Sequence, residues 1–350
     1  MALRRTFALT LLAALLCAPG PVTNARRPSA PRDLTPEATR AIERGLQWLA
    51  RTQNPDGSWL SDGSTGRFPV AMTALCGLAM LAEGNTTYSG PRAESVRAAV
   101  RYLLAQSDPD TGLIGTAEAG RPMFGHGFSM LFLAQVYGSE GDTVLRERLR
   151  GVLEPAVSLT AAAQTERGGW YYTPESTEHE GAVTMVQLQG LRACANARLP
   201  VPQRTVRRAM DYVRASANPD GGIAYRVGQE GPSRPAITCA AVATMYAAGI
   251  YEGELVDGAI RFARRNVATT APTPTGGTHF YYAHLYLSQV MYFRGGEEWS
   301  AYFPPLRDWL VGAQRADGSW QGEFIGRGYG TAVALMILQL PRNALPVLQR

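Results

Sequence analysis

Two kinds of apolar pattern alternate along the chain. In the first, apolar residues recur at intervals of three and four and leave one charged face, as in Thr35–Gln53 and Glu94–Gln106. This spacing predicts helices with one face in water. The run Thr35, Pro36 and Glu37 adds a capping side chain, a first-turn proline and an acidic residue, which together favour a helix start. We expect these segments to be outer helices.

The second pattern consists of segments that are apolar nearly all round. A helix without a polar face has to be buried, so these segments are predicted to be inner helices. They are Met72–Gly84, Gly127–Gly138, Val183–Ala197, Thr238–Gly249, His284–Gly295 and Gly330–Leu340.

A glycine-containing polar turn separates each outer segment from the following inner one. Gln53–Trp59 (QNPDGSW) and Gln314–Trp320 (QRADGSW) have the same frame, and related turns recur at roughly 55-residue spacing, shortened before the last, which is the mark of a supersecondary repeat. The others are Gln106–Ile114, Gln164–Trp170, Ala217–Ile223 and Thr273–Phe280. Six outer helices alternating with six inner ones predict an all-α fold, an (α/α)6 toroid. We expect the turn tryptophans to pack between neighbouring repeats.

The beginning of the chain has the layout of a secretory signal. Basic residues precede an apolar run too short to span a bilayer, and small residues follow it. We therefore expect a signal peptide over residues 1–25, a linker over 26–34 and a single toroid domain over 35–350. The predicted localisation is secreted or periplasmic, with the pair Arg4 and Arg5 leaving twin-arginine export open. No membrane span is expected after removal of the signal.

Composition excludes several classes of protein. The formal charge of +5 is modest for 350 residues, and the arginines are scattered, which argues against nucleic acid as a partner. The chain contains no lysine, so a Schiff base, a pyridoxal phosphate attachment and a phosphate-loop lysine are impossible. Cys76, Cys194 and Cys239 are widely spaced within apolar segments and are expected to be buried thiols.

The two QxxDGSW-type turns resemble the QW repeats of squalene-hopene and oxidosqualene cyclases, whose α/α toroid is shared with protein prenyltransferase β subunits and with bacterial prenyltransferase and squalene oxidase repeat proteins. The resemblance extends from about Thr35 to the end of the chain. It implies an acidic DxDD motif just before the threonine that opens an inner helix. None of the residues directly before Thr73, Thr184, Thr238 or Thr331 is acidic. Polycyclisation of squalene by that motif is therefore not expected.

The resemblance to protein prenyltransferases implies zinc held by Asp-x-Cys and a histidine. Cys239 lies near the expected place, but Ala236 and Ile237 stand where the aspartate would be, and Tyr282 replaces the histidine, with His284 two residues further on. A zinc site needs its full ligand set. We therefore expect neither a metal nor another cofactor.

In this fold the starts of the inner helices converge on a central cavity. Aromatic and weakly polar residues gather at these starts, where they could bind an apolar ligand or simply fill the barrel. The candidate ligand-binding residues are Phe124, His126, Phe128, Tyr281, Tyr282, His284 and Tyr329. A second cluster, Glu175, Glu178, His179 and Glu180, could serve acid–base hydrolysis but is interpreted as a solvated run of charges.

Fold alone does not define activity. The sequence favours an exported, non-catalytic module that binds an isoprenoid-like apolar ligand or a partner protein. The alternative is a squalene or terpenoid cyclase-like or prenyltransferase-like enzyme that acts on isoprenoids with an atypical active site.

Overall fold

The computed structural model describes residues 33–115, 118, 120–228, 231–268 and 279–344, and within them it contains twelve α-helices and no strand. The predicted signal peptide and most of the Thr273–Phe280 turn lie outside these residues. The outer helices are α2 (Pro36–Thr52), α4 (Ala93–Ala105), α6 (Thr143–Ala162), α8 (Gln203–Ala215), α10 (Glu254–Asn266) and α12 (Gly296–Ala313). The inner helices are α3 (Pro69–Leu81), α5 (Pro122–Ser139), α7 (Gly181–Asn196), α9 (Pro235–Ala247), α11 (Phe280–Arg294) and α13 (Arg327–Gln339), the last followed by the short 3-10 helix η1 (Leu340–Arg342).

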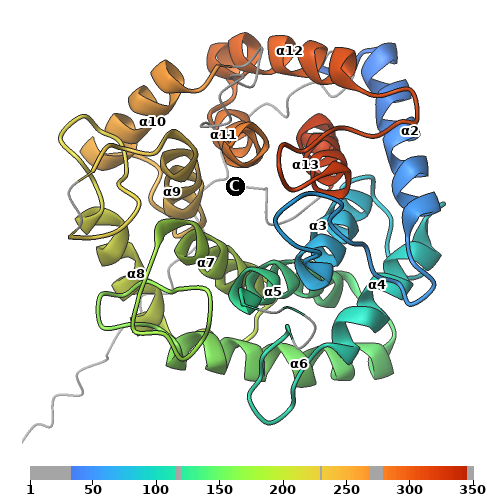
Figure 1. Cartoon of the computed structure of the whole chain (residues 1–350), viewed down its shortest axis with the longest axis horizontal. Coiled ribbons are helices and arrows are strands. Elements are labelled where there is room, and N and C mark those ends of the chain that lie inside the picture. The colour runs from blue at the N-terminus through green and yellow to red at the C-terminus, as the bar shows by residue number, and fades with distance from the viewer. Residues whose placement is uncertain (1–32, 116–117, 119, 229–230, 269–278, 345–350) are drawn as a thin grey trace, which may run out of the picture.

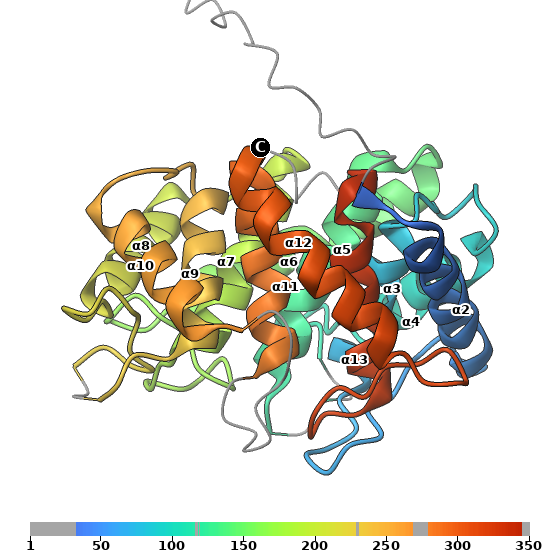
Figure 2. The ribbon, with the colours of Figure 1, turned by 90° about the horizontal axis from the view of Figure 1, so that it is seen from above.

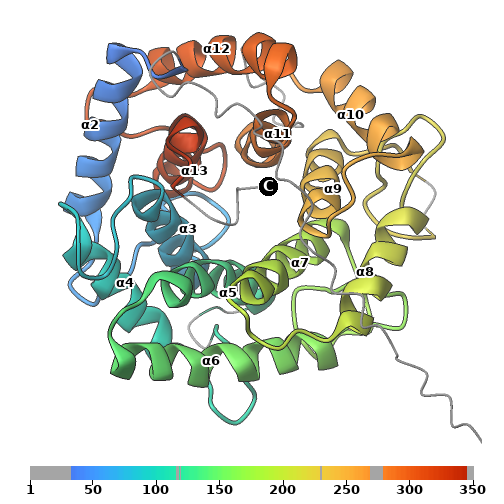
Figure 3. The same cartoon turned by 180° about the vertical axis from the view of Figure 1, so that it is seen from behind.

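The helices form two concentric rings (Figure 1). Each inner helix packs against the next, and α13 packs against α3, so that the inner ring is closed. The outer ring closes where α12 packs against α2, and the view from behind shows the same arrangement (Figure 3). The prediction of an (α/α)6 toroid is confirmed.

Burial follows the two sequence patterns. In α3 every residue from Val70 to Leu81 is buried, whereas α8 buries one face and exposes Arg204, Arg207 and Arg214 on the other. The structure therefore confirms that the all-apolar segments form the inner ring. It also confirms that Cys76, Cys194 and Cys239 are buried free thiols. Within the described residues, every helix is too short or too polar to cross a bilayer.

The tryptophan turns join the rings through the same set of hydrogen bonds in three repeats. Trp59, Trp170 and Trp320 are fully buried, and each indole N–H donates to a carbonyl ten residues earlier, at 2.9, 2.7 and 2.6 Å. Each tryptophan amide donates at 3.0 Å to a threonine hydroxyl of the following inner helix. The tryptophan therefore ties its outer helix to its inner helix.

The turn glycine packs on the next outer helix. Gly57, Gly168 and Gly318 have φ of 93°, 90° and 96°, a region that L side chains rarely adopt. A Cβ atom at Gly318 would lie 2.6 Å from the carbonyl oxygen of Arg44 in α2. The turn of the last repeat therefore packs directly on the first outer helix.

The first turn of an inner helix is bonded by the loop of the following repeat. This arrangement, which we call the reach-back contact, pairs amides that an isolated helix start would leave without partners. It occurs at five helix starts in the described residues. At three of them a side-chain carboxylate accepts from a backbone amide: Glu118 from Ala71 in α3, Glu323 from Phe280 in α11 and Asp62 from Arg327 in α13. At the other two a backbone carbonyl accepts: that of Tyr172 from the amide of Met123 in α5, and that of Tyr225 from the amide of Gly181 in α7.

Candidate functional site

A central cavity of about 400 Å³ lies where the inner helices begin. All six inner helices, or the residue just before their first turn, contribute to its wall, and Figure 2 shows the loops that lead into them gathered along one edge of the ring. Its lining is mostly apolar and aromatic and includes Phe68, Met72, Leu75, Phe124, Phe128, Tyr172, Tyr225, Ile237, Tyr282, Phe324 and Tyr329. Its volume is within the range of small-molecule binding sites.

Four of the seven candidate residues line this cavity, namely Phe124, Phe128, Tyr282 and Tyr329. Tyr281 is buried beside them, with its ring 6.4 Å from that of Tyr329, but it is absent from the cavity wall. The structure thus brings together an aromatic set that is close to the predicted one.

His126 lies elsewhere than expected. Its Nδ1 accepts from the amide of Ile114 at 3.1 Å, and its Nε2 lies 3.0 Å from the hydroxyl of Thr160 in α6. His126 therefore lies between the two rings and accepts the amide of the turn residue, as a threonine does in other repeats. Burial lowers its pKa to about 4.

His284 is also turned away from the cavity. Its Nδ1 lies 2.7 Å from the hydroxyl of Tyr302 in α12, and its Nε2 lies 3.0 Å from the carbonyl of Ala268. Burial lowers its pKa to about 4. Both histidines are fifth residues of their helices, where the side chain faces the outer ring.

Glu180 departs from the solvated charge run that the sequence suggested. Glu175 and Glu178 are exposed, but Glu180 is 1% exposed and lines the cavity. It caps α7 by accepting from the amides of Ala182 at 2.8 Å and Val183 at 2.5 Å. Burial raises its pKa, and these amide bonds oppose that rise without cancelling it.

A tyrosine pair leads to this carboxyl group. The hydroxyl of Tyr172 lies 2.8 Å from that of Tyr225, and Tyr225 opposes the rise in the pKa of Glu180. All three residues line the cavity. The arrangement holds the Glu180 carboxyl group in a mostly apolar wall, beside two tyrosine side chains.

Glu323 is a second carboxyl group in the wall, and no local sequence pattern pointed to it. It follows the last tryptophan turn, adopts a left-handed backbone (φ 51°) and accepts from the amide of Phe280. Burial raises its pKa. Its reach-back contact explains its position as a cap of α11.

Two arginines stand at the cavity mouth. Arg121 and Arg234 precede the first turns of α5 and α9, line the cavity and are exposed. The guanidinium of Arg121 lies over the ring of Tyr172, 4.6 Å from its centroid. Among the described residues neither forms an ion pair with a carboxylate, whereas nearby Arg226 pairs with Glu178 at 2.9 Å. These two positive charges are therefore available to a ligand.

Metal-binding residues do not assemble in the described part of the chain. It contains no group of three or more His, Cys, Asp or Glu side chains placed to hold an ion. Cys239 is completely buried, and burial raises the pKa of its thiol above the usual range.

Comparison with known proteins agrees with this architecture. No family model matches the chain. The drimenyl diphosphate synthase of Streptomyces showdoensis is 28% identical over 194 residues, which are 55% of this chain and 33% of that enzyme. The chain thus spans about a third of the length of the curated relative it matches.

Solved structures of the same fold cover nearly the whole chain. The type II terpene cyclase MstE from Scytonema, as a variant in complex with its substrate geranylgeranyl dihydroxybenzoate, has a TM-score of 0.60 at 15% identity and covers 88% of this chain and 98% of its own. A protein from Actinoplanes has a TM-score of 0.60 at 19% identity (88% and 99% covered). An inactive α-1,6-mannanase variant from Salegentibacter in complex with α-1,6-mannotriose has a TM-score of 0.63 at 10% identity and covers 88% of this chain and 99% of its own.

These likenesses show that the chain has the α/α-toroid fold of type II terpene cyclases, which confirms the predicted resemblance at the level of the fold. Because a mannanase shares the same rings, the fold leaves the chemistry open.

Proposed function

We propose that the protein binds an isoprenoid-like amphiphile in the central cavity, with the apolar chain inside and an anionic head group at the mouth. The observation that carries this proposal is the cavity of about 400 Å³ with an aromatic and aliphatic wall. Such walls favour apolar ligands because their burial removes apolar surface from water. The relative that makes drimenyl diphosphate and the cyclase bound to a geranylgeranyl compound support this ligand class.

The head group is inferred from the charges at the mouth. Arg121 and Arg234 line the opening, and Arg121 is held in place by its contact with Tyr172. Glu180 and Glu323 line the same cavity, but each carboxyl group accepts from at least one helix amide, and burial favours their neutral forms. The arginines therefore favour a phosphate or carboxylate over a neutral head.

Titration with farnesol and farnesyl monophosphate tests this proposal. We expect both to bind one per chain by native mass spectrometry, with the phosphate binding about tenfold or more tightly because charge-assisted hydrogen bonds are strong. The double variant Arg121→Gln/Arg234→Gln should lose that preference while retaining farnesol. Arg207→Gln, which removes an exposed arginine of α8, is the matched control. If neither farnesol nor farnesyl monophosphate binds, the proposal is refuted.

Catalysis on such a ligand is a second candidate, favoured by Glu180. A neutral carboxyl group in an apolar wall can transfer its proton to an alkene carbon, so that the π electrons form the new C–H bond and leave a cation on the neighbouring carbon. Attack by a second alkene closes a ring, and loss of a proton returns an isomer of the substrate. The aromatic wall can stabilise the intermediate cation.

Incubation with farnesyl diphosphate, followed by dephosphorylation and gas chromatography, tests this second candidate. An isomeric cyclic alcohol is expected, and Glu180→Gln should reduce its formation by about a hundredfold or more while farnesol binding persists. If the protein binds farnesol but yields no isomer, catalysis is rejected and ligand binding stands.

We also propose that the protein is exported to the periplasm or the medium. The support is the basic, apolar and small-residue succession of residues 1–25. A partner protein that collects or delivers the ligand there is compatible with this placement.

A further inference from the structure

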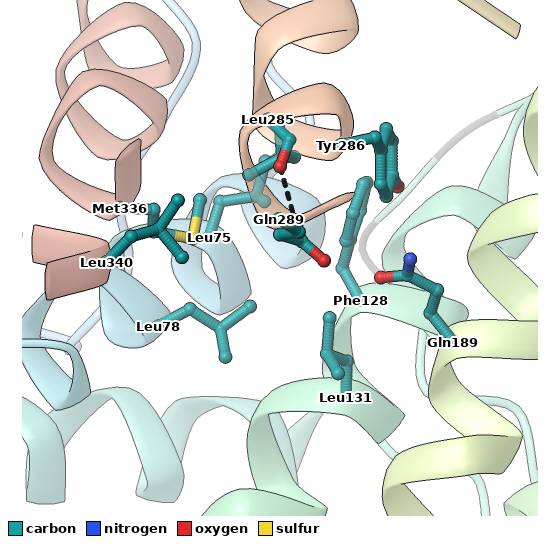
Figure 4. A pocket seen from close by; sticks show the side chains of 10 residues that line it. All are labelled: Leu75, Leu78, Phe128, Leu131, Gln189, Leu285, Tyr286, Gln289, Met336 and Leu340. Carbon is teal, nitrogen blue, oxygen red and sulfur yellow. Dashed lines mark hydrogen bonds between the residues drawn. The ribbon is translucent and has the colours of Figure 1, made fainter. Parts of the chain in front are cut away.

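A second, much smaller cavity lies deeper in the inner ring. Its volume is about 20 Å³, and Figure 4 shows Leu75, Leu78, Met336 and Leu340 facing Phe128 and Tyr286 around it. Leu131, Leu285, Gln189 and Gln289 complete its wall. The side-chain amide of Gln289 donates a hydrogen bond to the backbone carbonyl of Leu285 at 2.6 Å. This space accommodates little more than a single water molecule. We call it the inner chamber.

The central cavity and the inner chamber follow the same helix faces. In α3 the wall passes from Met72 to Leu75 and on to Leu78, and in α5 it passes from Phe124 to Phe128 and on to Leu131. Spacings of three and four keep these residues on one side of a helix, here the side that faces the axis. The two spaces are therefore successive levels of one axial channel.

Leu75 and Phe128 line both spaces and so separate them. Phe128 is the bulkier of the two, and in Figure 4 its ring stands beside Tyr286. The wall below this level is mainly aliphatic, so it suits the same apolar chain as the wall above it. The ring of Phe128 therefore stands at the boundary between the two spaces.

We propose that the inner chamber is a second compartment of the ligand site and that Phe128 limits the length of the apolar chain. This inference rests on the proposed ligand binding. In the unaltered protein the apolar chain of the ligand ends at Phe128. Shortening this side chain joins the chamber to the central cavity and admits one further isoprene unit.

A chain-length series tests the inference. Geraniol, farnesol and geranylgeraniol differ by one isoprene unit at each step, and native mass spectrometry gives their affinities. We expect Phe128→Ala to raise the ratio of geranylgeraniol to farnesol affinity by about tenfold or more, since even one methylene in an apolar pocket is worth that order of discrimination. Refilling the chamber in Phe128→Ala/Leu131→Phe should return the ratio toward its original value.

Phe132→Ala is the matched control, because it removes the same ring from the same helix. Phe132 packs against Gly77 of α3, where an added Cβ would lie 2.6 Å from its ring, and it lines neither space. The ratio should not change in this variant. Phe128→Leu provides a milder truncation if Phe128→Ala does not fold, with an intermediate shift expected.

The outcomes separate the inference from the proposed function. If the unaltered protein binds none of the three alcohols, the proposed function fails and the inference fails with it. If the unaltered protein binds them and a folded Phe128 variant keeps the original ratio, only the inference is overturned. An equal shift in Phe132→Ala would also overturn it, because the effect would then reflect general loosening of the ring.

Discussion

Replacing Trp170 by Ala is expected to lower the free energy of unfolding by about 3–5 kcal/mol, as for other large-to-small changes at buried aromatic positions. The indole is fully buried and its N–H donates to the carbonyl of Thr160 at 2.7 Å. The substitution therefore removes packing and leaves a buried carbonyl without its partner. Urea unfolding followed by circular dichroism measures the change.

Trp170→Phe separates the two contributions. It keeps an aromatic ring in the site but removes the indole donor, and should cost about 1–3 kcal/mol, the range for an unpaired buried polar group. Trp59 and Trp320 have the same bonds in their own repeats and should behave alike. A loss below about 1 kcal/mol for Trp170→Ala would contradict the role given to the turn.

Acidification from about pH 7 to pH 4 is expected to destabilise the unaltered protein by about 3 kcal/mol more than a His126→Thr variant. The pKa of His126 is about 4 in the folded state against an ordinary value of 6.5. Between these values the unfolded chain binds a proton that the folded protein does not, so stability falls as the pH falls. Threonine is the replacement of choice because Thr238 accepts the amide of Ile223 in the equivalent way at 2.9 Å.

The quantity to measure is the difference in unfolding free energy between the unaltered protein and the His126→Thr variant at each pH. Burial raises the pKa of Glu118 to about 7, so that the folded state binds this proton first and gains stability on acidification, which opposes the histidine effect. Because both proteins carry Glu118, its contribution cancels in the difference. Parallel profiles of unfolding free energy against pH would show that His126 takes its proton within the fold and would contradict its burial in the neutral form.

The fold could be predicted from the sequence because each repeat carries its own signals. Amphipathic and all-apolar segments alternate, and the turns between them share glycine and aromatic positions. The starts of the inner helices were placed too late. Pro69, Pro122 and Pro235 begin α3, α5 and α9, and these prolines are favoured in a first helical turn, where no amide donor is needed.

The candidate site could be predicted only in part. Aromatic residues near the helix starts were a sufficient signal for Phe124, Phe128, Tyr282 and Tyr329. His126 was wrongly predicted to line the cavity, because a histidine near a helix start can face either the axis or the outer ring, depending on its position along the helix. An alignment of the repeats that matches His126 with Thr73 and Thr184 would have shown that it faces the outer ring. Glu323 contacts an inner helix of the preceding repeat, and no local pattern encodes such a contact.

The reach-back contacts make the order of synthesis matter. As the chain leaves the ribosome, each inner helix is complete before the loop that pairs its first amides exists: α3 precedes Glu118, and α11 precedes Glu323. For α13 the order is reversed, since Asp62 was made in the first repeat and awaits Arg327. A nascent ring thus exposes unpaired amides and apolar helix faces until its last repeat arrives. Incomplete chains of this toroid should be recognised by chaperones and proteases, whereas closure of the ring removes both signals in one step.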